Sequence, residues 1–199
     1  MAEKIATLRS VIARIRGRRE DEIPQEHGDC FAHGLWLGPQ AENAEFHVNY
    51  HLRDAPDVYI NLSSVSGEDG PRPETGLMQR RADIERQAKH AGIEFLRFTT
   101  RQLHGVAYEE SIGREPKEVT GARVPGHTAI LQTDQAAQGR QAPFVAVEMF
   151  NGHYIPWPER SLEEAAKVPE LQRATLSEAE VIALWDAITA TLRPRPGAF

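Results

Sequence analysis

The stretch "EFHVNYHL", residues 45–52, decides the fold class because its apolar residues recur at every second position. The two alternating sets are Phe46, Val48, Tyr50 and Leu52 on one side and His47, Asn49 and His51 on the other. A period of two is that of a β-strand, whose successive side chains point to opposite faces of a sheet. Helical spacings of three and four are absent from the apolar set. The stretch therefore predicts a half-buried strand.

His47 and His51 raise the question of a zinc site, since two His four residues apart share one face of a helix. On the predicted strand they lie about 13 Å apart, at roughly 3.3 Å per residue. Zinc ligands each lie about 2 Å from the ion, so these two side chains cannot share one. A separate site at either His, completed by a neighbouring strand, remains as an alternative. The prediction is no metal and no cofactor.

Length and charge limit the class of protein to which the chain can belong. The 199 residues suffice for one good-sized domain that is stable without disulfides or a structural metal. Cys30 is the only cysteine, so no intrachain disulfide can form. The net charge of −6 and the pI near 5.8 give no basic footprint for nucleic acid. No run of 18 apolar residues is present, so no membrane span is predicted.

The chain divides by pattern into an N-terminal amphipathic helix (residues 1–20) and a single α+β domain (residues 21–199). The helix is expected over residues 3–17, where Ile5, Leu8, Ile12 and Ile15 recur at spacings of three and four. A second helix is expected over residues 77–90, ended by Gly92. Neighbouring strands are expected to pair antiparallel across short polar turns. The expected strands are residues 30–37, 45–52, 57–66, 93–100, 105–111, 126–134 and 143–151.

Two capping boxes, Ser161 to Glu164 and Ser177 to Glu180, predict where the two closing helices begin. The last helix has a core-facing stripe and stops at Pro194. Its stripe consists of Val181, Leu184, Trp185, Ile188 and Leu192. Strands in runs with helices inserted and appended predict the α+β class: a mainly antiparallel sheet with helices packed on one face. A PsbP-like arrangement is one form of that class.

Searches for catalytic motifs predict no enzyme and no catalytic residue. The string "SSVSG" lacks the first glycine of a nucleophile elbow and leads into an acidic loop. Cys30 and His33 would face opposite sides of a regular strand, which defeats a thiol–imidazole pair. Neither a phosphate-binding glycine loop nor the H-E-x-x-H or C-x-x-C zinc signature occurs.

Two polar loops stand out as candidate contact surfaces. The segment "GEDGPRPETG", residues 67–76, is rich in Gly, Pro and acids and predicts an exposed loop. In "NGHYIPWPER", residues 151–160, Tyr154 and Trp157 lie in a proline-interrupted loop, where aromatic side chains can anchor a protein partner. The alternative is that these two rings cover the open edge of the core.

The closing segment "EAEVIALWDAITATLRPRPGAF", residues 178–199, carries a family resemblance. Its Leu184-Trp185-Asp186 helix and its Arg-Pro-Gly-Ala end at 195–198 resemble the C-terminal domain of immunity proteins that neutralise type VI secretion lipase effectors, the Tle cognate immunity protein family. Upstream, Ile-Pro at 23–24, Gly-x-Cys at 28–30 and Leu-x-x-Arg at 77–80 are similar to the family pattern. The sequence departs from it at Val106-Ala107, where the family often carries Pro-Gly.

The resemblance implies a stoichiometric inhibitor that binds a phospholipase from a sister cell and blocks its active site or holds its lid. Our own prediction places the contacts in "GEDGPR" (67–72) and "GHYIPWP" (152–158) of the two polar loops, with Glu68, Asp69 and Arg72 at a polar rim and Tyr154 and Trp157 as anchors. The alternatives are a non-enzymatic module of PsbP-like fold that binds a ligand or an envelope protein, and a metal-dependent hydrolase using His47 or His51.

Location follows from the same resemblance. Full members of the family carry another domain ahead of this one and a signal for the periplasm. The N-terminus here is too charged for a secretory signal. We therefore expect a periplasmic protein by resemblance, and a cytoplasmic one if this chain is the complete product.

Overall fold

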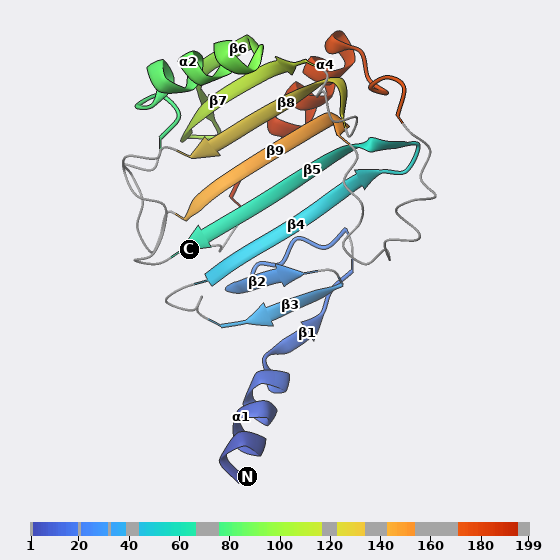
Figure 1. Ribbon diagram of the computed structural model, residues 1–199. Helices are drawn as coiled ribbons and strands as arrows, with labels where there is room; N and C mark the ends of the chain where they lie inside the picture. The colour runs from blue at the N-terminus through green and yellow to red at the C-terminus, as the bar shows by residue number, and fades with distance from the viewer. Residues whose placement is uncertain are drawn as a thin grey trace. The chain divides into compact units, whose positions relative to one another are not determined.

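The computed structural model describes residues 2–19, 21–31, 33–38, 44–66, 76–116, 123–133, 143–153 and 171–194. The chain forms two compact units, one of Met1–Ala44 with Arg193–Phe199 and the other of Glu45–Leu192. This division falls at residue 44, whereas the sequence pattern places a boundary after residue 20. Each unit has its own sheet (Figure 1).

The first unit contains helix α1 (Ala2–Ala13) and a three-stranded antiparallel sheet in the order β1-β3-β2. Its strands are β1 (Ile15–Gly17), β2 (Gly28–Phe31) and β3 (Gly34–Leu37). The helix is shorter than the predicted 3–17 because Ile15 leaves it to pair with Trp36 of β3. Leu35 at the centre of this sheet is fully buried.

The predicted strand 30–37 is wrong, because that segment is a hairpin. Phe31 and Gly34 are paired residues of β2 and β3, and His33 between them has φ of 60°, in the left-handed region. A Cβ on Gly34 would lie 2.1 Å from the exposed Phe31 ring, so a larger residue at this position would require that ring to move. The expected pairing of this segment with residues 45–52 is also wrong, since β3 pairs with β1 and β2.

The second unit is built on a six-stranded sheet in the order β4-β5-β9-β8-β7-β6 (Figure 1). The β6–β7, β7–β8, β8–β9 and β5–β9 pairs are antiparallel, which confirms the two later predicted hairpins. The strands are β4 (Ala44–Leu52), β5 (Ala55–Ser66), β6 (Glu94–Leu103), β7 (Val106–Glu115), β8 (Arg123–Thr133) and β9 (Phe144–His153).

Strand β4 shows the alternation that its sequence predicts. His47, Asn49 and His51 are exposed, whereas Phe46, Val48 and Leu52 are half-buried. Tyr50 departs from its apolar set and is 54% exposed. Strand β4 is the last strand of the sheet and has β5 as its neighbour.

Helix α2 ends and helix α4 begins where local signals place them, whereas α2 begins at Arg81 and not at the predicted residue 77, and α4 ends at Thr189, ahead of Pro194. Helix α2 (Arg81–Ala91) ends at Gly92, whose φ of 71° is the left-handed cap expected of a helix C-terminus. Helix α4 (Glu178–Thr189) begins with the predicted capping box, in which Ser177 and Glu180 bond each other's backbone amides. The Ser161 capping box lies outside the described residues.

The sheet carries one of these helices on each face. On β7, Ile112 is fully buried in a cluster with Val181 and Trp185 of α4, whereas its neighbours Ser111 and Gly113 face α2. The α+β class is confirmed, but the prediction that the helices share one face is wrong for α2. Successive side chains of β7 point to opposite faces of the sheet, so one set contacts α4 and the other contacts α2.

The polar centre of the α4 face is Glu110, a fully buried carboxylate on β7. Trp185 donates its Nε1–H to Glu110 Oε1 over 2.7 Å, and Arg101 donates to the same oxygen over 2.6 Å. Arg97 lies 3.2 Å from Glu110 Oε2 and forms a fork of two bonds with Asp186. The bond to Asp186 raises the pKa of Arg97 and lowers that of the Asp186 carboxyl. Helix α4 is thus held through charge-assisted bonds.

Replacing Glu110 tests how much this buried charge contributes to stability. Glu110→Gln keeps the shape but removes the negative charge that faces Arg97 and Arg101. We expect the free energy of unfolding to fall by about 3 kcal/mol, as when a buried ion pair loses one partner. The matched control, Glu94→Gln, breaks only the exposed pair with Arg114 and should cost under about 1 kcal/mol. Urea unfolding of both variants checks this; equal losses would contradict it.

Candidate functional site

Glu109, the neighbour of Glu110 on β7, points to the α2 face and anchors the segment that enters α2. It is 6% exposed and accepts three hydrogen bonds. The donors are the backbone amides of Leu77 at 2.6 Å and Met78 at 3.2 Å, and the Gln132 side chain at 3.1 Å. This carboxylate satisfies amides that precede the first turn of the helix. The anchor sets where α2 lies over the sheet.

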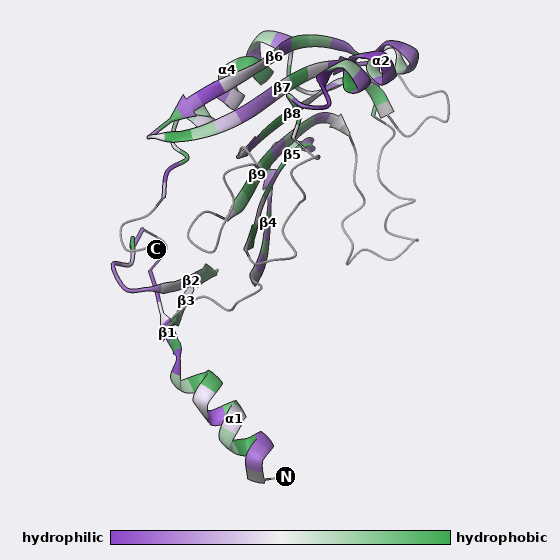
Figure 2. Ribbon diagram, turned by 90° about the vertical axis from the view of Figure 1, so that its left-hand side faces the viewer, coloured by the Kyte–Doolittle hydropathy of each residue, from purple (hydrophilic) through white to green (hydrophobic). Residues whose placement is uncertain are grey.

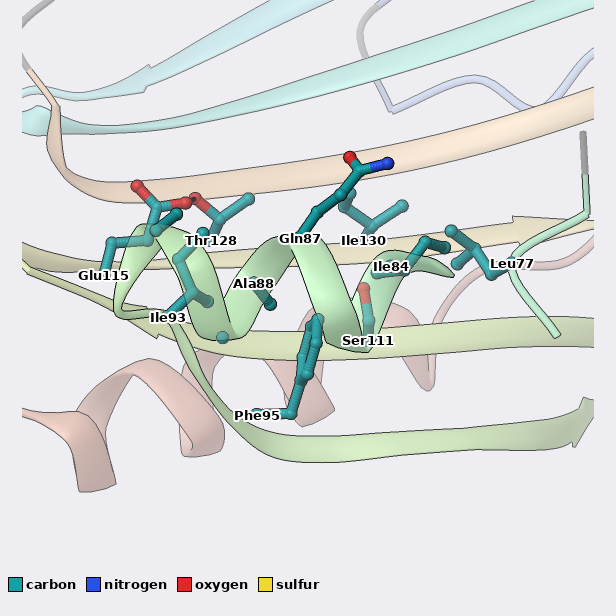
Figure 3. Close-up of a pocket in the computed structure, with 12 residues that line it drawn as sticks. Leu77, Ile84, Gln87, Ala88, Ile93, Phe95, Ser111, Glu115, Thr128 and Ile130 are labelled. Atoms are coloured by element: carbon teal, nitrogen blue, oxygen red, sulfur yellow. Dashed lines mark hydrogen bonds between the residues drawn. The ribbon is translucent and has the colours of Figure 1, made fainter. Parts of the chain in front are cut away.

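Beneath α2 lies a cavity of about 400 Å³, which we call the α2 cavity (Figure 3). Four of its lining residues are small: Ala88 and Ala91 on the helix, and Ser111 and Gly113 on β7. Larger side chains complete its walls. The lining consists of Leu77, Ile84, Gln87, Ala88, Ala91, Ile93, Phe95, Ser111, Gly113, Glu115, Thr128 and Ile130.

The chemistry of the α2 cavity suits an apolar group. Aliphatic and aromatic side chains form most of the wall, and the volume is at the lower end of the roughly 300–1,000 Å³ of ligand pockets. Its one charged lining group, Glu115, accepts a short hydrogen bond from the Thr128 hydroxyl. In the described part of the chain, no cluster of three His, Cys, Asp or Glu residues could hold a metal ion.

The two His of β4 have local partners. His47 Nε2 lies 2.7 Å from Glu45 Oε1, and both side chains are more than half exposed. The His51 ring stacks on Tyr59 with 5.8 Å between ring centroids. Glu45 is a possible metal ligand beside His47, but no described group of three His, Cys, Asp or Glu residues gathers at these positions. The alternative of a metal-dependent hydrolase therefore gains no support from the geometry of β4.

The segment that leads into α4 is held by two fully buried side chains, Asp57 and Asn151. Asp57 accepts from the backbone amides of Gly152 at 3.1 Å and Thr175 at 2.8 Å, and from the Thr175 hydroxyl. Asn151 donates to the Leu176 carbonyl and accepts from the Leu176 amide. Together these bonds position the start of α4 on its face of the sheet.

His127 lies beside this segment and is 8% exposed. Asn151 Nδ2 donates to its Nδ1 over 3.1 Å, which places the imidazole proton on Nε2, 3.7 Å from Glu178. Burial lowers the pKa of His127 and outweighs the opposing effect of Glu178. Arg114 in turn lowers the pKa of the Glu178 carboxyl through its hydrogen bond. The folded site therefore favours the neutral form of the His127 imidazole.

The predicted contact residues Glu68, Asp69, Arg72, Tyr154 and Trp157 all lie outside the described residues. Their roles stay predictions. The anchors Glu109 and Glu110 were not singled out from sequence. A signal was present, since two adjacent acids in a strand with apolar neighbours must point to opposite faces. In a sheet covered on both sides, both carboxylates become buried and each needs partners.

Comparison with known protein families identifies the chain. Residues 22–197 match the family described as the Tle cognate immunity protein 4 C-terminal domain. The chain belongs to this family. The resemblance expected from the closing segment is thereby confirmed. The family is one of immunity proteins and not of enzymes, as the sequence predicts.

Solved structures share the fold of this family member. The immunity protein TplEi of the type VI secretion system of Pseudomonas aeruginosa, complexed with an "L" peptide, is 21% identical with a TM-score of 0.68. The match covers 98% of this chain and 64% of that chain. The Tle4–Tli4 complex gives 21% identity and a TM-score of 0.69 over 99% and 60%. The chain thus spans about three fifths of these structures. No match is found among curated proteins.

The residues that carry the family resemblance have structural roles here. Trp185 and Asp186 of the Leu-Trp-Asp helix are the groups that bond Glu110 and Arg97. Leu77 of the Leu-x-x-Arg segment donates its amide to Glu109. The departure at Val106-Ala107 is accommodated because the hairpin turn is His104-Gly105, both with positive φ, and Val106 already pairs with Leu103.

Loss of the Glu109 anchor should loosen α2 alone. In Glu109→Gln the side-chain amide presents a donor where Leu77, Met78 and Gln132 also donate, so one buried donor is left unpaired. An unpaired buried group costs about 1–3 kcal/mol, so we expect amide exchange of residues 77–91 to accelerate about 10-fold or more. Residues 178–189 should keep their protection. Hydrogen exchange read by mass spectrometry measures both.

The control for this measurement is Glu85→Gln, which removes an exposed pair with Arg81 on the surface of α2. Its exchange should match that of the wild type. Equal acceleration of α2 in the two variants would show that Glu109 does not anchor the helix.

The lowered pKa of His127 predicts a pH dependence of stability. The unfolded chain binds a proton at His127 more readily than the folded one, so its contribution is complete above about pH 6.5 and is lost as pH falls toward the folded pKa. His127→Gln should flatten the decline of unfolding free energy between pH 7.5 and 5.5. The control Asn49→Gln, a non-titratable exposed position on β4, should leave the slope unchanged. Urea titrations at stepped pH decide between these outcomes.

Proposed function

We propose that this chain binds a lipase effector of the type VI secretion system and neutralises it, by blocking the effector's active site or holding its lid. The observation that carries the proposal is the match of residues 22–197 to the Tle cognate immunity protein 4 C-terminal domain. A solved relative of the same fold is the Tli4 component of a Tle4–Tli4 complex. The partner that we propose for this chain is a lipase of the Tle class.

The fold supports a role in binding. Helices α2 and α4 are fixed to opposite faces of one sheet by buried carboxylates, which provides a rigid framework. Rigid frameworks bind tightly because little conformational freedom is lost on association. An immunity protein must also reject foreign effectors, and charged groups around a contact surface provide that discrimination. Among the described residues, no helix is long and apolar enough to cross a membrane.

The two polar loops remain our proposed contact surface. Glu68, Asp69 and Arg72 would form its polar rim, and Tyr154 and Trp157 would be its anchors. Aromatic side chains are over-represented among the residues that dominate binding energy, which supports this choice. We propose the periplasm as the site of action, because the family resemblance implies it.

Calorimetric titration against the lipase effector encoded beside this gene tests the function. We expect one-to-one binding with a nanomolar Kd, and lipase activity that falls in proportion to added protein until the molar ratio reaches one. A folded sample that neither binds nor inhibits would refute the proposal.

The anchors are tested by the double variant Tyr154→Ala/Trp157→Ala. If both rings are anchors, Kd should rise at least about 30-fold, the effect of a single residue that dominates an interface. Tyr50→Ala is the matched control, because Tyr50 is an exposed aromatic residue on β4 outside both loops. Wild-type affinity of the double variant would remove the anchor assignment and leave the function in place.

A further inference from the structure

We propose that the α2 cavity receives one large apolar side chain of the effector, presented on an acidic surface. This inference rests on the proposed function, and it names a second point of contact in the described part of the chain. Three observations carry it: the unfilled apolar volume, the basic charge of the helix that covers it, and the rigidity of that helix.

The volume is the first observation. Protein interiors are packed about as densely as organic crystals, and voids larger than a water molecule are few. Here about 400 Å³ stays unfilled by side chains, and four of the lining residues are small: Ala88, Ala91, Ser111 and Gly113. The ring of Phe95 and the side chains of Ile84 and Ile130 form apolar walls (Figure 3). A wall of this kind gains contacts only when an apolar group enters. One aromatic or long aliphatic side chain is the natural occupant.

The charge around the cavity is the second observation. The chain as a whole carries −6, yet residues 80–91 hold four basic side chains against two acidic ones, a net +2. The helix is largely hydrophilic (Figure 2). Asp83 pairs with Arg86, and Glu85 with Arg81. Arg80 and Lys89 are exposed, and no described residue pairs with their side chains. This local positive charge fits carboxylates on the partner's surface.

Rigidity is the third observation. Glu109 fixes the entry of α2, and the Gly92 cap fixes its end. Arg81 lies over the Phe98 ring of β6 at 5.0 Å, which adds a contact between the helix and the sheet. The cavity is therefore held open before a partner arrives. Preorganised pockets of this kind receive the anchor side chains that dominate many protein interfaces.

Ala91→Phe tests the cavity, because Ala91 lines it and is itself exposed at the end of α2. A phenyl group there fills the mouth of the cavity without displacing a buried side chain. We expect Kd for the effector, measured by calorimetry, to rise at least about 30-fold. Ala82→Phe is the matched control: Ala82 is exposed on the same helix and does not line the cavity. Its Kd should stay within about twofold of the wild type.

Charge is tested separately by Lys89→Glu, with Lys4→Glu on exposed α1 as its control. Reversing a rim charge acts mainly on the association rate. We expect Lys89→Glu to slow association several-fold and to weaken its dependence on salt, as measured by stopped-flow mixing. Lys4→Glu should leave both unchanged.

The outcomes separate this inference from the proposed function. Wild-type protein that does not bind the effector refutes the function and the inference together. Effector binding that Ala91→Phe leaves unchanged overturns the inference alone. A titration with laurate tests the alternative occupant, a free acyl chain. The inference is wrong if wild type binds laurate and Ala91→Phe does not, while both bind the effector equally. In that case the cavity takes a free acyl chain.

Discussion

The second unit depends on two adjacent carboxylates, Glu109 and Glu110, at the centre of β7. Consecutive side chains of a strand point to opposite faces, so one carboxylate reaches each covered side of the sheet. Glu109 accepts backbone amides at the entry to α2, and Glu110 accepts the Trp185 indole and two arginines. A buried carboxylate without partners is strongly unfavourable. Each helix is therefore tied to one position on the sheet.

This constraint gives the two faces different properties. On the α4 face, Trp185 and Ile112 belong to a cluster of buried apolar residues, and Asp57 and Asn151 hold the segment ahead of the helix. On the α2 face, small residues on helix and sheet leave a cavity that no side chain of the described residues fills. One face supplies stability, and the other offers an apolar volume to a partner.

This difference between the two faces of the sheet suits a protein that acts by binding. The chain belongs to the family described as the Tle cognate immunity protein 4 C-terminal domain. Trp185 and Asp186, on which its sequence resembles that family, lie in the α4 network. Under the proposed function, specificity for one effector would reside in surface groups that can vary without disturbing the buried network.

The sequence by itself determined the features that arise from local interactions: the alternation of β4, the glycine that ends α2, the Ser177 capping box and the hairpins of β6 to β9. It also determined the family, through the Leu-Trp-Asp helix. Tertiary structure decided that residues 30–37 turn back at His33, that α2 takes the face opposite α4, and that Glu109 and Glu110 are buried. The physical reason is that these outcomes also depend on partners outside the local segment: Trp185, which bonds Glu110, is 75 residues away, and β3 pairs with β1 as well as with β2. A local pattern records the spacing of apolar and polar residues, whereas burial depends on which distant surface covers them.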